Sequence, residues 1–304
     1  MTVKRAKLSC DGPELSEIAF GTWRILDQDP LPSAADIATR LEKCLELGIT
    51  TIDTAEIYGG YTVEAAVGTG LAESADFKGA FEVVTKCGID VPSETKAGVT
   101  LPHYNATAEN LVNCAEKSLR HLGVDSIDLF LVHRPDWFTP AEETAKGLDQ
   151  LISSGKIKHA GVSNYTRDQF ELLDSIVNQR LVTNQVEINL LNMDALYDGS
   201  LAQCEQRKIR PMGWSVLGGG ELFGDSIQAR RLREAFEKIR EKYDGAGDDA
   251  LATAWVMAHP SRPLAITGSN KIERIESQAQ AGSIQLERQD WYELWSAAKG
   301  QSVP

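Results

Sequence analysis

Cysteine pairs, metal-binding clusters and long apolar runs are scarce in this chain of 304 residues. The five cysteines are odd in number, widely spread and without a C-x-x-C pair: Cys10, Cys44, Cys87, Cys114 and Cys204. This spacing argues against a disulfide framework and against a zinc site, and it predicts reduced thiols in a cytoplasmic protein. We therefore expect no metal.

No uninterrupted apolar stretch approaches the about 18 residues that a membrane-spanning helix needs, so no membrane association is expected. Residues 1–20 mix basic and acidic side chains and contain no apolar segment, which is not the pattern of a signal peptide. Positive charge is also in deficit, because the formal net charge is -13 at pH 7. Such a chain repels phosphate backbones, which excludes nucleic acid as an expected partner but leaves room for a small nucleotide bound by a few local cations.

A Rossmann-type fingerprint and a P-loop lysine motif are both absent. Residues 245–247 read Gly-Ala-Gly, but they follow a polar helix end and not a buried strand. The three glycines at 218–220 are by themselves only weak support for a phosphate site. If this chain binds a nucleotide, another architecture must hold it.

Strand-like and helix-like segments alternate along the chain. Short apolar or β-branched runs occupy 17–23, 50–53, 81–86, 127–133, 158–163, 181–187, 209–214 and 264–267. Helical spacing follows in segments such as 34–47, 107–122, 140–153 and 167–178. Alternation predicts a parallel sheet, and eight units in a chain of this length favour closure into an α/β fold, the (β/α)8 TIM barrel, as one domain over 1–304.

The two ends of the chain are expected to add to the barrel. Residues 2–12 precede the first unit and are predicted to form an N-terminal β-hairpin that plugs the barrel floor. Among the extra C-terminal helices, Arg288–Lys299 is expected to pack through Trp291, Leu294 and Trp295. A nucleotide bound to a barrel is expected at its C-terminal face, near the last strands.

Four polar residues lie at or just beyond the ends of consecutive predicted strands. Asp53 ends the second strand, Tyr58 follows in the next loop, Lys86 ends the third and His133 ends the fourth. Neighbouring strands lie about 4.8 Å apart, so these groups are expected within about 10 Å of one another. Each alone has an ordinary explanation as a helix cap, a packing residue, a solvated strand end or a loop histidine. Their joint occurrence is much less expected on that basis.

The quartet has a chemical logic. A phenol with an ordinary pKa of about 10 donates protons poorly near pH 7, and a neighbouring ammonium favours its phenolate. Asp53 would keep Lys86 charged and oriented, and His133 would donate a hydrogen bond to a carbonyl oxygen as negative charge develops there. Such a set suits protonation of an alkoxide while a hydride arrives from elsewhere.

Five segments in order along nearly the whole chain resemble the aldo-keto reductase family. They are 48–59 with Asp53 and Tyr58, 83–88 with Lys86, 125–135 with His133, 155–164, and 184–187. The run Tyr58-Gly59-Gly60-Tyr61 and the ending Ser302-Val303-Pro304 are especially similar to a bacterial branch of poorly defined substrate. The resemblance implies that Tyr58 is the general acid and that Asp53, Lys86 and His133 complete a tetrad.

The resemblance also implies a nicotinamide cofactor. Ser163, Asn164 and Gln185 would orient its carboxamide, Trp214 would stack on its ring, and Ser215 and Leu217 would cover its pyrophosphate. The full set of implied cofactor residues is Gly21, Thr22, Trp23, Ser163, Asn164, Gln185, Trp214, Ser215, Leu217, Gly219, Gly268, Ser269, Asn270, Arg274 and Gln278. The implied substrate pocket consists of Trp23, Tyr58, His133 and Trp137, with the segment 88–104 as a wall, which suggests an apolar aldehyde or ketone.

Arg274 is the natural partner of a 2′-phosphate, which favours NADPH/NADP+ over NADH. The sequence departs from the family pattern at two places. Gly268 stands where many relatives have a phosphate-binding lysine, and Ser277-Gln278 replaces a frequent Glu-Asn pair. One cationic contact is therefore missing unless Lys271 supplies it, and NADH stays possible.

The sequence thus predicts a monomeric NADPH-dependent oxidoreductase acting on a small-molecule aldehyde or ketone. One alternative is a cofactor-binding regulatory barrel that senses redox state with negligible turnover. Another is a Schiff-base lyase or aldolase that uses Lys86 as nucleophile, since barrels host many chemistries.

Overall fold

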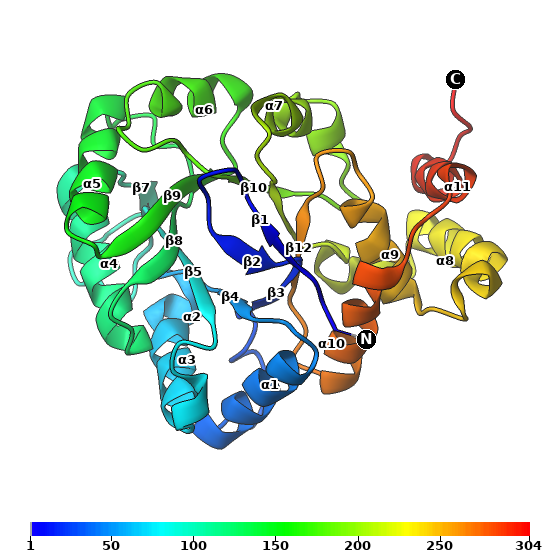
Figure 1. Cartoon of the computed structure of the whole chain (residues 1–304), viewed down its shortest axis with the longest axis horizontal. Helices are drawn as coiled ribbons and strands as arrows, with labels where there is room; N and C mark the ends of the chain where they lie inside the picture. Colours follow the sequence, from blue (N-terminus) through cyan, green and yellow to red (C-terminus); the bar gives the residue numbers. More distant parts are fainter. Residues whose placement is uncertain (1) are drawn as a thin grey trace.

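A closed barrel of eight parallel strands forms the centre of the computed structural model, which describes residues 2–304 (Figure 1). Its strands in chain order are β3 (Ile18–Gly21), β4 (Thr51–Asp53), β5 (Glu82–Cys87), β8 (Ile127–Val132), β9 (Ile157–Ser163), β10 (Asn184–Glu187), β11 (Met212–Trp214) and β12 (Leu264–Thr267). The last strand closes on the first, with Ala265 of β12 opposite Ile18 of β3. The predicted (β/α)8 barrel is confirmed.

Eight helices form a ring around the barrel; seven lead from one barrel strand to the next, and α10 follows the last strand. They are α1 (Ala34–Glu46), α3 (Val63–Ala72), α4 (Ala108–Leu122), α5 (Ala141–Ser153), α6 (Arg167–Asp174), α7 (Ser200–Arg207), α9 (Asp248–Met257) and α10 (Ile272–Ala279). Local sequence sets their ends: Ser33 and Asp36 form a capping box at the start of α1, and Gly123 ends α4 with a left-handed φ of 67°.

The barrel interior is apolar and is closed at its N-terminal end by a hairpin of β1 (Arg5–Lys7) and β2 (Glu14–Ser16). Leu8 and Leu15 of this hairpin are fully buried and pack with interior side chains such as Leu129 and Met212. The hairpin reaches further than the predicted 2–12, because its turn falls after Leu8 and its second strand runs directly into β3. It serves as the predicted plug.

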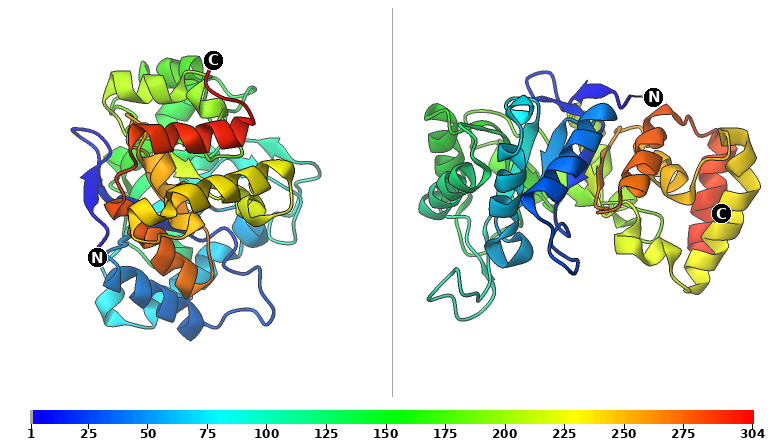
Figure 2. Two further views of the ribbon diagram at one scale, coloured as in Figure 1. Left: turned by 90° about the vertical axis from the view of Figure 1, so that its right-hand side faces the viewer. Right: turned by 90° about the horizontal axis from the view of Figure 1, so that it is seen from below.

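Two further helices pack outside the ring, where α8 (Ile227–Ile239) and α11 (Arg288–Lys299) lie side by side (Figure 2). Trp291 of α11 stacks on Trp255 of α9 with ring centroids 4.8 Å apart. Each indole N–H donates to the other residue's carbonyl oxygen, at 3.1 and 3.0 Å. This reciprocal pair attaches the C-terminal helix to the ring.

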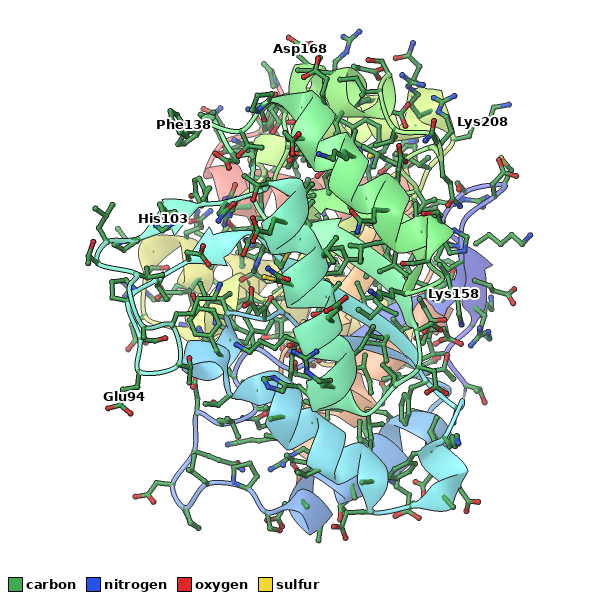
Figure 3. All side chains as sticks on the ribbon, turned by 90° about the vertical axis from the view of Figure 1, so that its left-hand side faces the viewer. Glu94, His103, Phe138, Lys158, Asp168 and Lys208 are labelled. Atoms are coloured by element: carbon green, nitrogen blue, oxygen red, sulfur yellow. The ribbon has the colours of Figure 1, made fainter. Side chains whose placement is uncertain are left out.

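Smaller elements sit on the loops. They are the turn α2 (Tyr58–Tyr61), the hairpin of β6 (Ile89–Asp90) and β7 (His103–Tyr104), and the 3-10 helices η1 (Ala75–Phe77), η2 (Asp194–Leu196), η3 (Gly218–Phe223), η4 (Arg240–Tyr243) and η5 (Gln280–Ser283). In Figure 3 the labelled His103 and Phe138 project from the end of the barrel opposite the hairpin of β1 and β2. Within residues 2–304, no helix is both long and apolar enough to cross a membrane.

Candidate active site

The structure brings the four predicted strand-end residues together at the C-terminal end of the barrel. Asp53 is the last residue of β4, Lys86 is the penultimate residue of β5, and Tyr58 begins α2. His133 follows β8 directly, and its backbone N–H donates to the carbonyl oxygen of Cys87 at 2.8 Å. Parallel strands in register therefore deliver all four groups to one place.

Lys86 is the centre of the group. Its fully buried ammonium donates to Asp53 Oδ1 at 2.8 Å, to the carbonyl oxygen of Thr54 at 2.7 Å and to Tyr58 Oη at 3.1 Å. These three bonds use all three N–H donors of the ammonium. Gln185 Nε2 donates to the other carboxylate oxygen of Asp53 at 2.8 Å, so Asp53 is held on both sides.

The protonation states follow from burial and charge. Burial lowers the pKa of Lys86, but Asp53 and Tyr58 raise it more, and the net pKa lies above its ordinary value. Burial raises the pKa of Tyr58, and the Lys86 ammonium opposes this only in part. The sequence-based expectation weighed the ammonium alone; in the structure, burial is the larger effect. Tyr58 is therefore a protonated phenol near neutral pH, and Lys86 is charged.

A charged ammonium whose three donors are all occupied is not a nucleophile. This geometry speaks against a Schiff-base role for Lys86.

His133 is neutral in this setting. Burial, together with the positive charges of Lys86 and Arg134, holds its pKa well below the ordinary value of 6.5. Its Nδ1 atom is buried and has no hydrogen-bond partner among the described residues. The ring meets Tyr58 edge to face, with centroids 5.9 Å apart. A neutral imidazole in this position can donate one hydrogen bond to an oxygen bound beside Tyr58.

The neutrality of His133 can be tested by nuclear magnetic resonance. We expect the imidazole carbon-bound proton of His133 to keep its chemical shift as the pH falls from 8 through the ordinary histidine pKa of about 6.5. The His133→Gln variant assigns the signal, since only that resonance disappears. A His133 signal that titrates near its ordinary pKa would contradict the assignment of a neutral hydrogen-bond donor.

Above the four residues opens a cavity of about 400 Å³. Sixteen of the predicted site residues line it: Gly21, Trp23, Asp53, Tyr58, His133, Ser163, Asn164, Gln185, Trp214, Ser215, Leu217, Gly219, Gly268, Ser269, Arg274 and Gln278. They come from the ends of barrel strands other than β5, from the segments that follow those strands, and from helix α10. The cavity therefore spans most of the C-terminal face.

Four predicted site residues do not line this cavity. Lys86 and Thr22 are fully buried behind the wall, where the hydroxyl of Thr22 donates to the carbonyl oxygen of Asp53 at 3.1 Å. Asn270 lies beyond the rim and donates to the carbonyl oxygen of Arg24 at 2.5 Å. Trp137 is 81% exposed and meets Tyr104 edge to face at 5.6 Å.

A side-chain network forms the wall on the β9 to β11 side. The hydroxyl of Ser163 donates to the carbonyl oxygen of Gln185 at 2.9 Å, and Asn164 Nδ2 donates to that hydroxyl at 2.8 Å. Trp214 Nε1 donates to Asn164 Oδ1 at 3.1 Å, which fixes the indole. Asn164 has a left-handed φ of 59°. Such a backbone is held by its surroundings, and it occurs often at functional sites.

Ser215, Gly268 and Arg274 bring open space and one positive charge to the cavity wall. Ser215 has a left-handed φ of 56° at the end of β11, and a Cβ placed on Gly268 would meet nothing within 4 Å. Arg274 projects there, with its guanidinium 5.2 Å from the ring centroid of Phe223. In the part of the chain that the structure describes, Arg274 has no carboxylate partner.

Two arginines that the sequence analysis did not single out also line the cavity. Arg24 donates to the carbonyl oxygen of Gly219 at 2.8 Å, which links the loop after β3 to η3 across the opening. Arg134 lies next to His133, with its guanidinium 5.9 Å from the Trp214 ring centroid. The position of Arg134 directly after a strand-end residue was the available signal.

Comparison with known proteins places the chain among oxidoreductases. Residues 17–299 match the family model described as the Aldo/keto reductase family. The 6-dehydroglucose reductase of Agrobacterium fabrum is 43% identical over 99% of this chain and 100% of its own length. Oxidoreductase YdhF of Escherichia coli is 40% identical over 99% and 100%. A Klebsiella pneumoniae aldo-keto reductase crystallised with NADPH is 25% identical, with a TM-score of 0.78 over 97% of this chain and 94% of its own.

Proposed function

Because this chain belongs to the aldo/keto reductase family, we propose that it reduces small aldehydes or ketones to alcohols with NADPH. The observation that carries this proposal is the bond of 3.1 Å between the buried Lys86 ammonium and the Tyr58 phenol at the floor of the cavity. Through this bond, the Lys86 ammonium lies directly beside an O–H group that faces any carbonyl oxygen bound in the cavity. NADPH, when bound, supplies the hydride.

The chain's own residues supply the proton and fix the geometry. Tyr58 donates its proton to the carbonyl oxygen as negative charge develops on it. The Lys86 ammonium stabilises the resulting phenolate, and Asp53 holds that ammonium in place at 2.8 Å. Neutral His133 donates the second hydrogen bond to the same oxygen, which is electrostatic stabilisation of the transition state.

The cavity wall fits a nicotinamide cofactor. Ser163, Asn164 and Gln185 present amide and hydroxyl groups side by side, which suits a carboxamide. The fixed indole of Trp214 offers a flat face next to them. At the far end, the open space over Gly268 leaves room for phosphate groups. The NADPH complex of the Klebsiella pneumoniae relative supports this cofactor.

Arg274 is proposed to set the preference for NADPH over NADH. We expect Arg274→Met to raise the KM for NADPH by about tenfold or more, because a charge-assisted bond to a phosphate contributes about 1.5 kcal/mol or more. The KM for NADH, which lacks the 2′-phosphate, should stay within about twofold. Lys271→Met tests the other candidate cation, and a larger effect there than at Arg274 would contradict the assignment.

The substrate is proposed to be a polar, hydroxyl-bearing aldehyde. Two relatives that are 43% and 35% identical carry the name 6-dehydroglucose reductase. Arg134 lines the cavity beside His133 and can donate to hydroxyl oxygens. The expectation of an apolar substrate rested on Trp23, Trp137 and the segment 88–104. Trp23 lines the cavity, but Trp137 and the segment 88–104 do not. Comparing kcat/KM for a sugar dialdehyde with that for an aliphatic aldehyde of similar length tests this choice.

We also propose that the chain acts in the cytoplasm, as a single domain and a monomer. Every residue that lines the cavity comes from one closed barrel. The cysteines, all unpaired among the described residues, suit a reducing compartment.

A further inference from the structure

The loop that carries Tyr58 has an unusual backbone. Gly59, Gly60 and Tyr61 are all left-handed, with φ of 56°, 63° and 75°. Glycines adopt such angles freely, but a residue with a side chain rarely does unless its surroundings hold it there. The question is what holds Tyr61, three residues beyond the proposed general acid.

Residues 88–104, called here the insert, hold the side chain of Tyr61. The insert contains β6 and β7, and its labelled residues Glu94 and His103 lie at the outer edge of the molecule (Figure 3). The Tyr61 hydroxyl accepts from the backbone N–H of Val91 at 2.9 Å and donates to the carbonyl oxygen of Ile89 at 3.3 Å. Tyr61 is only 3% exposed.

Lys96 of the insert contacts the loop on both sides of Tyr58. Its ammonium lies 5.0 Å from the ring centroid of Tyr61, a cation–π distance. It also lies 3.1 Å from Glu56 Oε1 and forms a hydrogen bond with Asp90 within the insert. Burial lowers the pKa of Lys96, but Asp90 and Glu56 raise it more, so the side chain is charged.

Glu56 connects this contact to the floor of the site. Its side chain is 2% exposed, and its backbone N–H donates to the carbonyl oxygen of Lys86 at 3.0 Å. Glu56 therefore lies on the loop that joins the end of β4, at Asp53, to Tyr58, and its backbone bonds this loop to the Lys86 strand. Its second oxygen, Oε2, is buried without a hydrogen-bond partner among the described residues. Lys96 is thus a main neutralising contact of a buried charge.

We propose that Lys96 is a positioning residue for Tyr58. By binding Glu56 before the phenol and Tyr61 after it, the ammonium ties the Tyr58 loop to the insert and keeps Tyr58 Oη within reach of Lys86. Lys96 does not line the cavity and touches neither Tyr58 nor the cofactor wall. Its effect belongs to proton donation and not to cofactor binding. This inference rests on the proposed function of Tyr58.

Lys117 provides a matched control within the same cluster. Its ammonium lies 5.2 Å from the same Tyr61 ring centroid and 4.0 Å from Glu56 Oε1. It comes from α4, and within the described residues it makes no ion pair or hydrogen bond with the insert. Removing its charge weakens the cation–π and Coulomb contacts but leaves the insert attached.

The experiment measures the single-turnover rate of aldehyde reduction by enzyme premixed with NADPH. We expect Lys96→Met to lower this rate by about ten- to a hundredfold, because small misplacements of a catalytic group have effects of that size. The Kd of NADPH, measured by fluorescence quenching, should stay within about twofold. Lys96→Arg should recover most of the rate, and Lys117→Met should stay within about threefold of wild type.

Two results would overturn the proposal. One is a Lys96→Met rate equal to that of wild type, and the other is a loss in Lys117→Met as large as in Lys96→Met. Tyr61→Phe is a second test in case the Lys96 variant does not fold, since it removes only the hydroxyl oxygen that bonds to the insert. It should show the same loss of rate at unchanged NADPH affinity, and a wild-type rate in this variant also contradicts the proposal.

Amide hydrogen exchange separates this inference from the proposed function. If the wild-type enzyme binds NADPH but reduces no aldehyde, the proposed function fails, and exchange then tests the positioning role alone. Residues 56–61 should exchange faster in Lys96→Met than in wild type and Lys117→Met. Unchanged exchange over this segment would contradict the role of Lys96.

Discussion

Replacing Tyr58 by phenylalanine is expected to lower kcat by about 10²- to 10⁴-fold, the range for loss of a general acid. The variant keeps the ring, and with it the contacts to Trp23 and His133 at 6.2 and 5.9 Å between centroids. It removes only the oxygen that accepts from Lys86. The Kd of NADPH should change less than about twofold. Steady-state kinetics and fluorescence titration measure the two quantities.

This split is informative because it identifies an interaction made in the transition state. A loss confined to kcat and kcat/KM at unchanged cofactor affinity marks such an interaction, whereas a rise in KM alone marks ground-state binding. A Tyr58→Phe enzyme with more than about a tenth of wild-type kcat would remove Tyr58 from the role of proton donor.

Lys86→Met is expected to lower kcat about as much as Tyr58→Phe does. Unlike Tyr58→Phe, it is also expected to destabilise the fold. Without the ammonium, the Asp53 carboxylate would be a buried charge whose remaining side-chain hydrogen bond comes from Gln185. Breaking a buried ion pair by removing one partner costs about 3–5 kcal/mol. We therefore expect the free energy of unfolding in urea to fall by about 3 kcal/mol.

The pH dependence of that difference has a defined sign. The pKa of Lys86 is raised in the folded state, so its contribution to stability is fully present below its ordinary pKa of about 10.4 and is lost as the pH rises through the folded value. The difference from wild type should be constant between pH 6 and 9. Lys158→Met is the control, since the Lys158 side chain is 56% exposed and its bond to Asp128 is expected to contribute about 1 kcal/mol or less. A Lys86→Met protein as stable as this control would contradict the account.

The meeting of the four strand-end residues was predictable because strand periodicity fixes where side chains meet. Once the strands were placed, Asp53, Lys86 and His133 had to meet at one end of the barrel, and the structure puts them there. The N-terminal hairpin and the packing of α11 through Trp291 also followed from local pattern.

Other features depend on contacts between distant segments and leave no local pattern. The bond between Arg24 and Gly219 joins residues 195 positions apart. Trp137 is exposed and lies outside the cavity, and no periodicity in its loop indicated that it faces outward. The pKa of Tyr58 is raised because the phenol is deeply buried. The spacing of Tyr58 and Lys86 along the chain carried no information about that burial.

The most direct test of the central claim is to mix the purified protein with NADPH and a panel of aldehydes that includes a sugar dialdehyde. The absorbance of the reduced nicotinamide is then followed over time. We expect the absorbance to fall in step with alcohol formation for at least one polar aldehyde. Binding of NADPH without loss of absorbance across the panel would contradict the reductase assignment and favour a regulatory barrel, and no binding of NADPH at all would contradict the cofactor site itself.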